Sequence, residues 1–380
     1  MNETSSITSI LEFGSSNLRL AVYDKINLSE KFFFESKINY LKNKNSDKNH
    51  PVFSLIDKVE KSIGQHLNEI LLVLDSSNIY SLDYSIMKNF ENKKVTNEDI
   101  NYLINECEQI IKKSNKDQNI LHIIVSNINF DGKVLEDYSK ISQEVKNVIL
   151  ELKFILILDK DLDFIRQLLL KKHISLSNIF CASYIKSLDK TKNIDSTNYN
   201  AFIDIGLKKS SLSILKDNKL LYLNNTHVGG EHITKDISKV LKIDLRNAEA
   251  EKIKFSKISK IKNNLKDKTL IKDVINSRLE EIIELLFLDC PLIKNNIFKN
   301  DLKVYFIGNG SKVLNQNLLT FGSEFDFIQE MTVIHEKGNE CCHGAANHIK
   351  DIEKIQPQIT SLTLENKGFF EKFFDYFSSK

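Results

Sequence analysis

The chain has 380 residues, of which 41% are apolar and 27% charged, a composition typical of a soluble globular protein built from two or more units. Its net charge of +2, without a basic stripe interleaved with aromatic residues, argues against nucleic-acid binding. No stretch approaches the ~20 apolar residues that span a bilayer. Five scattered cysteines and the absence of a secretory leader pattern indicate a reducing cytoplasm, and the adjacent Cys341 and Cys342 do not suit a metal site.

The first part of the chain predicts a hairpin followed by a helix and a buried strand. Strands are expected at 7–14 and 15–24, with the turn at Gly14, and a third strand lies within 31–40. A helix is predicted at about 51–68, because Pro51 suits the first turn of a helix. The apolar run 70–74 predicts a buried strand.

The middle of the chain predicts mixed helices and strands. Thr96, with Asp99 three residues later, resembles a capping box at the start of a helix that runs to about residue 113. Short strands are expected at 121–125 and 134–135, and a buried strand at 153–158. A helix at 162–172 and a strand at 178–182 complete this part.

The second half begins with the same module as the first. Strands are predicted at 200–206, 211–216 and 219–226, with a glycine turn after the first. In both halves an apolar strand carries an acid, then an apolar residue, then a glycine, and serines follow: Glu12-Phe13-Gly14-Ser15-Ser16 and Asp204-Ile205-Gly206 with Ser210-Ser211. This repetition indicates an internal duplication.

The repeated turn suits a bound phosphate. Glycine has no Cβ, so backbone amides in such a turn can approach a phosphate closely. A carboxylate on the preceding strand can hold hydrated Mg²⁺ or orient a water, and Asp204 is the predicted metal contact. The alternative is a pair of strand-end acids that face water. The predicted phosphate contacts are Glu12, Gly14, Ser15, Ser16, Asp204 and Gly206.

Two further glycine pairs extend this predicted site. Gly308 and Gly310 follow an expected strand at 303–307, where an adenine platform would lie. Gly229 and Gly230 stand just before a helix, whose dipole and free N–H groups favour an anion. A plain loop-to-helix turn is the alternative for the second pair.

Residues 368–380 carry an aromatic face. At ~100° per residue, the aromatic side chains fall within an arc of roughly 160°, opposite acidic and basic residues whose charges nearly cancel. The polar stretch 351–367 predicts a linker, which favours insertion of the face into a membrane headgroup layer over docking on the chain's own core. With little charge to attract anionic lipid, apolar burial would supply the binding energy. The predicted membrane contacts are Phe369, Phe370, Phe373, Phe374, Tyr376 and Phe377.

The order of these motifs resembles the actin/Hsp70/sugar-kinase superfamily. Within it, residues 228–237 (Val-Gly-Gly-Glu-His-Ile-Thr-Lys-Asp-Ile) followed by 247–252 (Asn-Ala-Glu-Ala-Glu-Lys) resemble the bacterial cell-division family FtsA, as does the aromatic tail. The resemblance implies an α/β, actin-like fold of two lobes with duplicated mixed-sheet domains and an inserted α+β subdomain. It also implies that Glu249 and Lys252 contact the nucleoside of bound ATP.

The resemblance further implies polymerisation through the insertion and tethering of FtsZ, by its C-terminal peptide, to the cytoplasmic face of the inner membrane at the division site, with other divisome proteins as partners. It predicts lobe 1 at 1–84 and 152–199 with a helix at about 340–352, the insertion at 85–151, the lobe 2 core at 200–234 and 301–339, a helical subdomain at 235–300, a linker at 353–367 and a membrane-targeting helix at 368–380.

The turn after Asp204 departs from the family pattern. Leu207 and Lys208 stand where the family has glycines, which restricts positive φ angles and close approach to a γ-phosphate. Lys208 or Lys209 could contact a phosphate instead, or remain solvated. We therefore predict binding of ATP and Mg²⁺ with weak or no hydrolysis, and no catalytic residue. The alternatives are a small-molecule kinase of the same superfamily and a PilM-like pilus-assembly adaptor.

Overall fold

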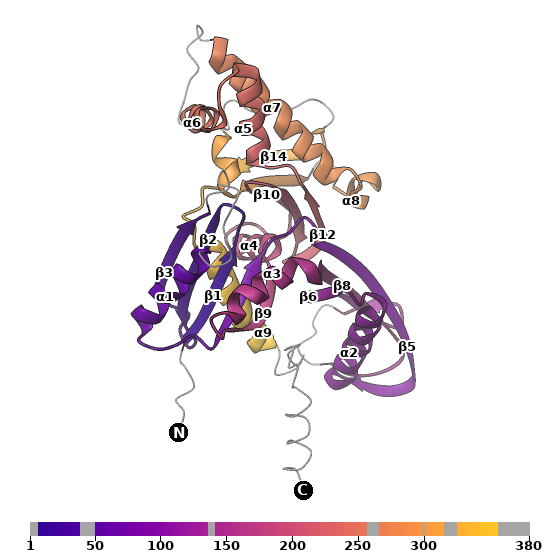
Figure 1. Ribbon diagram of the computed structural model, residues 1–380. Coiled ribbons are helices and arrows are strands. Elements are labelled where there is room, and N and C mark those ends of the chain that lie inside the picture. Colours follow the sequence, from indigo (N-terminus) through magenta and orange to yellow (C-terminus); the bar gives the residue numbers. More distant parts are fainter. Residues whose placement is uncertain are drawn as a thin grey trace.

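The computed structural model describes residues 7–38, 50–135, 141–256, 266–298, 301–314 and 325–355. Within this part of the chain, two five-stranded sheets are separated by a pair of packed helices, and a four-stranded sheet stands to one side (Figure 1). The architecture is α/β and two-lobed, as the sequence predicts.

Lobe 1 is a mixed sheet with strand order β3-β2-β1-β4-β9. Its first three strands form antiparallel neighbours, whereas β1, β4 and β9 run parallel. Helix α1 starts where the His50 Nδ1 accepts the Val52 amide at 3.3 Å, and it ends at Gly64, whose φ is +71°. The elements are β1 (Ile7–Phe13), β2 (Asn17–Asp24), β3 (Glu30–Lys37), α1 (Pro51–Ile63), β4 (Glu69–Leu74), α3 (Asp159–Leu170) and β9 (Ser175–Cys181).

Lobe 2 repeats this topology with strand order β12-β11-β10-β13-β14. Again an antiparallel three-strand meander leads into parallel neighbours, so β10 takes the place that β1 has in lobe 1. The duplication predicted from the two hairpins is confirmed at the level of strand order. The strands are β10 (Tyr199–Ile205), β11 (Ser210–Lys216), β12 (Lys219–Thr226), β13 (Leu302–Ile307) and β14 (Ile328–Val333). The helices are α5 (Gly230–Leu241), α6 (Leu245–Ser256), α7 (Lys266–Phe287), α8 (Pro291–Lys294) and the 3₁₀ turn η2 (Asn309–Val313).

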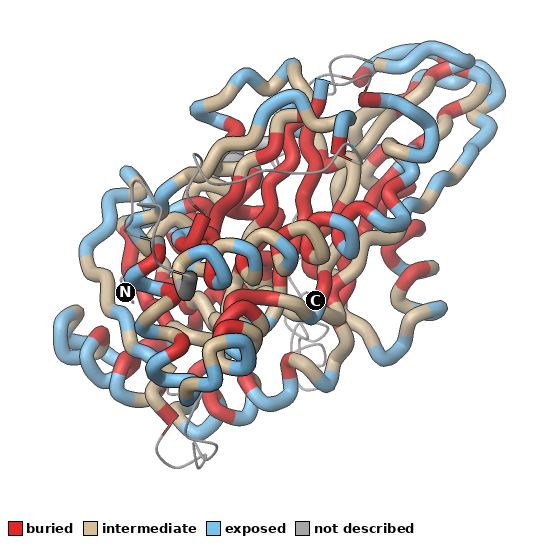
Figure 2. The backbone as a smooth tube through the Cα atoms, turned by 90° about the horizontal axis from the view of Figure 1, so that it is seen from above, coloured by how far each residue is buried: buried red, intermediate tan, exposed pale blue. Residues whose placement is uncertain are grey.

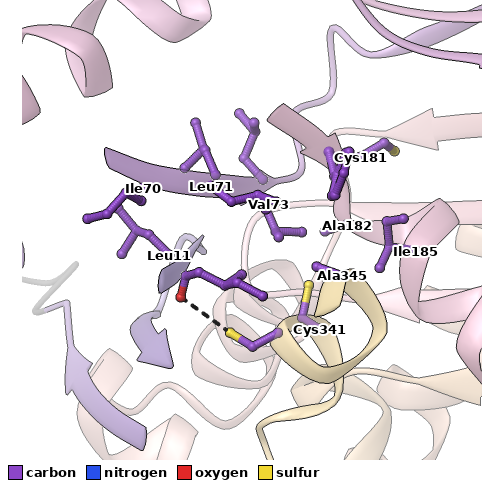
Figure 3. Packing of buried hydrophobic residues seen from close by; sticks show 14 of the residues in the cluster. Leu11, Ile70, Leu71, Val73, Cys181, Ala182, Ile185, Cys341 and Ala345 are labelled. Atoms are coloured by element: carbon purple, nitrogen blue, oxygen red, sulfur yellow. Dashed lines mark hydrogen bonds between the residues drawn. The ribbon is translucent and has the colours of Figure 1, made fainter. Parts of the chain in front are cut away.

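Helices α4 (Ala182–Thr191) and α9 (Glu340–Ile355) pack against each other between the two sheets. Small side chains let them approach closely: a Cβ on Gly344 would lie 3.0 Å from the Ile185 side chain. Cys341 and Ala345 of α9 face Leu11 of β1 in the lobe 1 core (Figure 3). The adjacent cysteines therefore serve as small buried apolar residues. Buried backbone is concentrated in these central strands and helices (Figure 2).

The third sheet has the order β5-β8-β6-β7, with α2 packed on one face. Its elements are β5 (Tyr80–Thr96), α2 (Asn97–Ser114), β6 (Gln118–Phe130), β7 (Lys133–Val134) and β8 (Ser142–Leu158). Strand β5 extends over the predicted boundary at 84/85 and β8 over that at 151/152, so both boundaries fall inside strands. Only the apolar end of β8 was predicted, because its first part alternates between buried and exposed residues.

The start of α2 allows a direct test of the predicted cap. The Asp99 carboxylate accepts the Thr96 amide at 2.8 Å and the Thr96 hydroxyl at 2.9 Å. We expect Asp99→Ala to lower the stability of the third sheet by about 1 kcal/mol, because a helix cap of this kind is lost. Thermal unfolding would show a lower Tm than for Glu98→Ala, an exposed acid in the same turn. Equal Tm values for the two variants would contradict the cap.

Helices α4 and α9 are joined by polar contacts as well. Asp189 of α4 receives hydrogen bonds from His343, at 3.3 Å, and from Asn347, at 3.0 Å. The bond to Asp189 raises the pKa of His343 against an opposing effect of burial. Burial alone would raise the pKa of Asp189, but the bonds from His343 and Asn347 lower it.

A pH dependence follows from this pair. The stabilisation by charged His343 is fully present below its unfolded pKa of about 6.5 and is lost as the pH rises through the higher folded value. We expect the wild-type Tm to fall between about pH 6 and pH 8, and to fall less in His343→Gln. His335→Gln, at an exposed position, is the control and should follow the wild type. Parallel curves for all three proteins would show that the pair is not coupled to folding.

Of the described helices, none is long and apolar enough to cross a bilayer.

Candidate nucleotide cleft between the lobes

The two acid-x-Gly turns have the same geometry and lie at equivalent sheet positions. The Gly14 amide donates to the Asn17 carbonyl at 3.1 Å, and the Gly206 amide donates to the Lys209 carbonyl at 2.9 Å. Each follows the central strand of its sheet, at the carboxyl end of the parallel strands, where open α/β sheets bind ligands. Ser15 is exposed at the tip of the first turn.

Asp204 is covered on both carboxylate oxygens by the protein itself. Lys186 of α4 donates to its Oδ2 at 2.7 Å. Its Oδ1 lies against the backbone at Gly308, where an added Cβ would come within 2.1 Å of it. Gly308 has φ +86° and ψ 165°, a conformation that is almost exclusive to glycine.

Lys186 holds a second carboxylate. Its Nζ lies 3.1 Å from Oε2 of Glu336, which also accepts the Gly308 amide at 3.0 Å. The lysine and both acids are buried, with 9%, 13% and 8% of their side chains exposed. Burial by itself lowers the pKa of Lys186, but the attraction of Asp204 and Glu336 outweighs it and raises that pKa well above its ordinary value. Lys186 is therefore a buried cation that is paired with two carboxylates.

Glu12 has its own cation on the neighbouring strand. Because β1 and β2 pair in a tight hairpin, Glu12 lies directly opposite Arg19, whose Nη1 donates to it at 2.7 Å. The Arg19 Nε also donates to Glu35 of β3 at 2.8 Å. Burial raises the pKa of Glu12 even though Arg19 and Lys186 lower it. With Arg19 at 2.7 Å and only 13% of its side chain exposed, Glu12 lies in an ion pair and does not face water.

Another ion pair bridges the lobes directly. Lys209, in the lobe 2 turn, lies 2.5 Å from Asp75, which follows β4 of lobe 1. Ser211 of β11 donates to the other oxygen of Asp75 at 3.1 Å. The side chains of Lys209 and Asp75 are only 15% and 16% exposed. Lys209 is therefore neither solvated nor free to meet a phosphate in this conformation.

The amides at the start of α5, predicted to bind an anion, already have partners. Those of Gly230 and Glu231 donate to the carbonyls of Gly206 and Leu207 at 2.9 and 2.8 Å. The Gly229 amide donates to Nδ1 of His232 at 3.2 Å. A Cβ on Gly229 would lie 2.6 Å from the backbone nitrogen of Lys209. These glycines let the helix start pack on the lobe 2 turn, and an anion could reach the amides only by displacing that turn.

Glu249 and Lys252 of α6 also satisfy each other. Lys252 lies 2.7 Å from Oε2 of Glu249, and it donates to the Thr234 hydroxyl at 2.7 Å and to the Gly230 carbonyl at 3.0 Å. Gly310 packs on the end of β10, where an added Cβ would lie 2.6 Å from the Ile205 carbonyl oxygen. The loops of lobe 2 are therefore in close mutual contact.

The structure brings most of the predicted residues to one place, although their contacts are with each other. Eight of them lie around the end of β10: Asp204, Gly206, Gly229, Gly230, Glu249, Lys252, Gly308 and Gly310. Glu12 is also near, since the charges of Lys186 and Asp204 affect its pKa. Sequence reasoning missed Arg19, Asp75, Lys186 and Glu336. Arg19 could have been found from the hairpin register, and Lys186 as a charge one helical turn after the buried Ala182. Phe369, Phe370, Phe373, Phe374, Tyr376 and Phe377 lie outside the described residues, as do residues 356–367 of the predicted linker.

These contacts decide whether the cleft fits Mg²⁺ and a nucleotide. Mg²⁺ is bound by carboxylate and water oxygens at about 2.0–2.1 Å, and phosphates need free amides or cations. Here Asp204 is held by Lys186, the α5 amides donate to carbonyls, and Lys209 is paired with Asp75. The residues do not fit magnesium-bound nucleotide in this conformation, which runs against the sequence-based prediction for Asp204.

Comparisons with known proteins identify the family resemblance. The family model described as "Cell division protein FtsA" matches residues 201–359. Two curated relatives, the cell division proteins FtsA of Helicobacter pylori strains 26695 and J99, are 22% and 25% identical over 57% and 43% of this chain. These alignments span only 42% and 33% of the relatives' own lengths.

A solved structure supports the fold over almost the whole chain. The structure titled "PilM-PilN type IV pilus biogenesis complex" covers 94% of this chain and 99% of its own, with a TM-score of 0.56 and 13% identity. At this identity the similarity shows the fold alone. The fold and the FtsA resemblance predicted from the sequence are therefore both confirmed: the chain has an actin-like fold, and residues 201–359 are similar to FtsA.

Proposed function

We propose that the chain is a cell-division adaptor that assembles in an actin-like manner and holds FtsZ at the cytoplasmic face of the inner membrane. The observation that carries the proposal is the match of residues 201–359 to FtsA, which includes most of β10, the elements from β11 to β14 and the whole of α9. The actin-like fold and the aromatic pattern at 368–380 support it.

The third sheet is the surface that we propose for contacts between copies. In the described part of the chain, β5 and β7 are its edge strands. Met87 on β5 is 68% exposed and Val134 on β7 is 57% exposed. Edge strands with unpaired backbone groups and exposed apolar side chains favour association with another chain.

Nucleotide binding is not part of the proposed mechanism. The actin-like fold makes ATP a plausible ligand, but the charged side chains of the cleft are paired with one another and do not fit Mg²⁺ there. The adaptor role needs only a folded body, a surface for FtsZ and a membrane contact. We accordingly expect ATP turnover near background.

A recruitment assay tests the proposal. Purified FtsZ is mixed with lipid vesicles, with and without the full chain, and the vesicles are sedimented. We expect FtsZ to sediment only when the chain is present, and FtsZ lacking its C-terminal peptide to stay in the supernatant. Vesicles alone and chain alone are the controls. If FtsZ stays in the supernatant while the chain itself sediments with the vesicles, the FtsZ part of the proposal is wrong.

A second candidate is a pilus-assembly adaptor, which the fold match to the PilM-PilN structure favours. That similarity extends over 94% of this chain, whereas the FtsA model matches residues 201–359. The recruitment assay separates the two candidates, because a PilM-like adaptor would give no FtsZ in the pellet.

A further inference from the structure

We propose that three cations of the chain itself close the cleft between the lobes, in the place where an actin-like protein would hold Mg²⁺ and nucleotide. The inference concerns the body of the fold and goes beyond the adaptor role, which could fail without affecting it. We call this group the cleft charge cluster: the cations are Arg19, Lys186 and Lys209, and the acids are Glu12, Asp75, Asp204 and Glu336.

The cluster is assembled from both lobes. Glu12 and Arg19 come from β1 and β2, and Asp75 follows β4, so all three belong to lobe 1. Asp204 ends β10, and Lys209 precedes β11 in lobe 2. The remaining pair, Lys186 on α4 and Glu336 just before α9, belongs to the segments that connect the lobes. A closed cleft therefore places charges from every part of the body next to one another.

Lys186 is the central member. Its ammonium joins two acidic side chains, Asp204 at 2.7 Å and Glu336 at 3.1 Å, as a bridging divalent cation would. Because α4 packs on both β9 of lobe 1 and the β10–β11 hairpin of lobe 2, this contact fixes the connecting helix to lobe 2. An ion at Asp204 would have to expel a buried lysine.

Lys209 and Asp75 form the contact that crosses the cleft. Their ion pair of 2.5 Å joins the lobe 2 turn to the end of a lobe 1 strand, with Ser211 as a second link. A phosphate held between the two hairpins would need Lys209 to leave Asp75. The turn that carries Lys209 is also held by helix α5, because the carbonyls of Gly206 and Leu207 accept hydrogen bonds from the amides of Gly230 and Glu231.

Three cations offset most of the charge of the four acids without a metal ion, although Glu12 Oε2, Asp75 Oδ1, Glu336 Oε1 and Lys209 Nζ have no hydrogen-bond partner among the described residues. Lys186 has a raised pKa and stays charged, because two acids attract it more strongly than burial opposes it. Burial raises the pKa values of Glu12 and Asp75, which favours their neutral forms. The four acids therefore carry less negative charge in excess of the three cations. Lys209, in the turn that departs from the family pattern, supplies one of the cations.

The first test uses the full-length wild-type protein and Mg-ATP as the probe. We expect the Tm in EDTA and the Tm in millimolar Mg-ATP to agree within about 1 °C, because a ligand that does not bind the folded state cannot stabilise it. Calorimetric titration of Mg-ATP should give no saturable heat. A Tm that rises by several degrees with Mg-ATP, and does not rise with ATP in EDTA, would overturn the proposal.

The second test is a double-mutant cycle on the central pair. Lys186→Met leaves two buried acids without their cation, so its Tm should fall well below that of Lys190→Met, a control on the same helix. Lys186→Met combined with Asp204→Asn should recover part of this loss, because one unpaired acid is removed. If Lys186→Met does not fold, the double variant still decides, since recovery of a folded protein supports coupling. Strictly additive losses, or a double variant no more stable than the single one, would contradict the cluster.

Discussion

Gly308→Ala is expected to destabilise the protein by about 2–6 kcal/mol, a large part of the stability of an ordinary domain. Two effects add. The φ of +86° with ψ of 165° is strained for any residue with a Cβ, and that Cβ would lie 2.1 Å from Oδ1 of Asp204 and 2.8 Å from the Ile205 carbonyl. Chemical denaturation would show a much lower midpoint, or no folded protein.

Gly132 offers a matched control for this prediction. It has nearly the same φ, +89°, but nothing lies within 4 Å of the position of its Cβ. Gly132→Ala should therefore lose only the backbone term, about 1 kcal/mol. If the two variants are equally stable, the loop at Gly308 does not pack on Asp204 as described, and the cleft is more open than the structure indicates.

The repeated module shows how much of the fold could be predicted. A glycine that ends an apolar strand, followed by serines and another apolar strand, specifies a hairpin locally, and Gly14 and Gly206 do form equivalent turns. Because the same pattern occurs twice, the duplication follows without knowledge of any distant contact. The strand order of both lobes confirms it.

Strand β5 shows why other parts were missed. Over Tyr80–Thr96 most side chains are exposed or half-buried, since β5 is an edge strand with α2 on one face only. An edge strand needs few apolar residues, so hydrophobic periodicity gives little signal. Its pairing with β8 is a long-range contact that the local sequence does not encode.

The candidate site was predicted in position but not in chemistry. Acids and glycines at the ends of parallel strands correctly indicated where the loops meet. The partner of each acid depends on tertiary structure: Lys186 reaches Asp204 only because α4 lies between the sheets. Local sequence could indicate that Lys186 is a charge on an apolar helix face, but not which carboxylates it meets.

Removal of residues 368–380 is expected to abolish binding to lipid vesicles. The segment carries six aromatic residues and nearly balanced charges, so apolar burial rather than attraction to lipid headgroups would supply the affinity. At half burial each aromatic side chain contributes about 1 kcal/mol, and the set contributes several. Binding should therefore depend little on ionic strength or on the fraction of anionic lipid.

Matched variants separate the aromatic face from the polar face. Phe370→Ser, Phe373→Ser and Phe377→Ser together should reduce binding as strongly as truncation does. Glu371→Ser, Lys372→Ser and Asp375→Ser together should leave it nearly unchanged, because the apolar face is intact and the net charge changes by only one unit. Loss of binding in the polar-face variant alone would show that lipid charge is recognised instead.

The adaptor role is tested most directly by co-sedimentation of FtsZ with vesicles in the presence of either the full chain or the chain that ends at residue 367. The account predicts that FtsZ sediments with vesicles and the full chain, and that the truncated chain leaves both proteins in the supernatant. Equal recovery of FtsZ in the pellet with the two chains would contradict a tether that acts through residues 368–380.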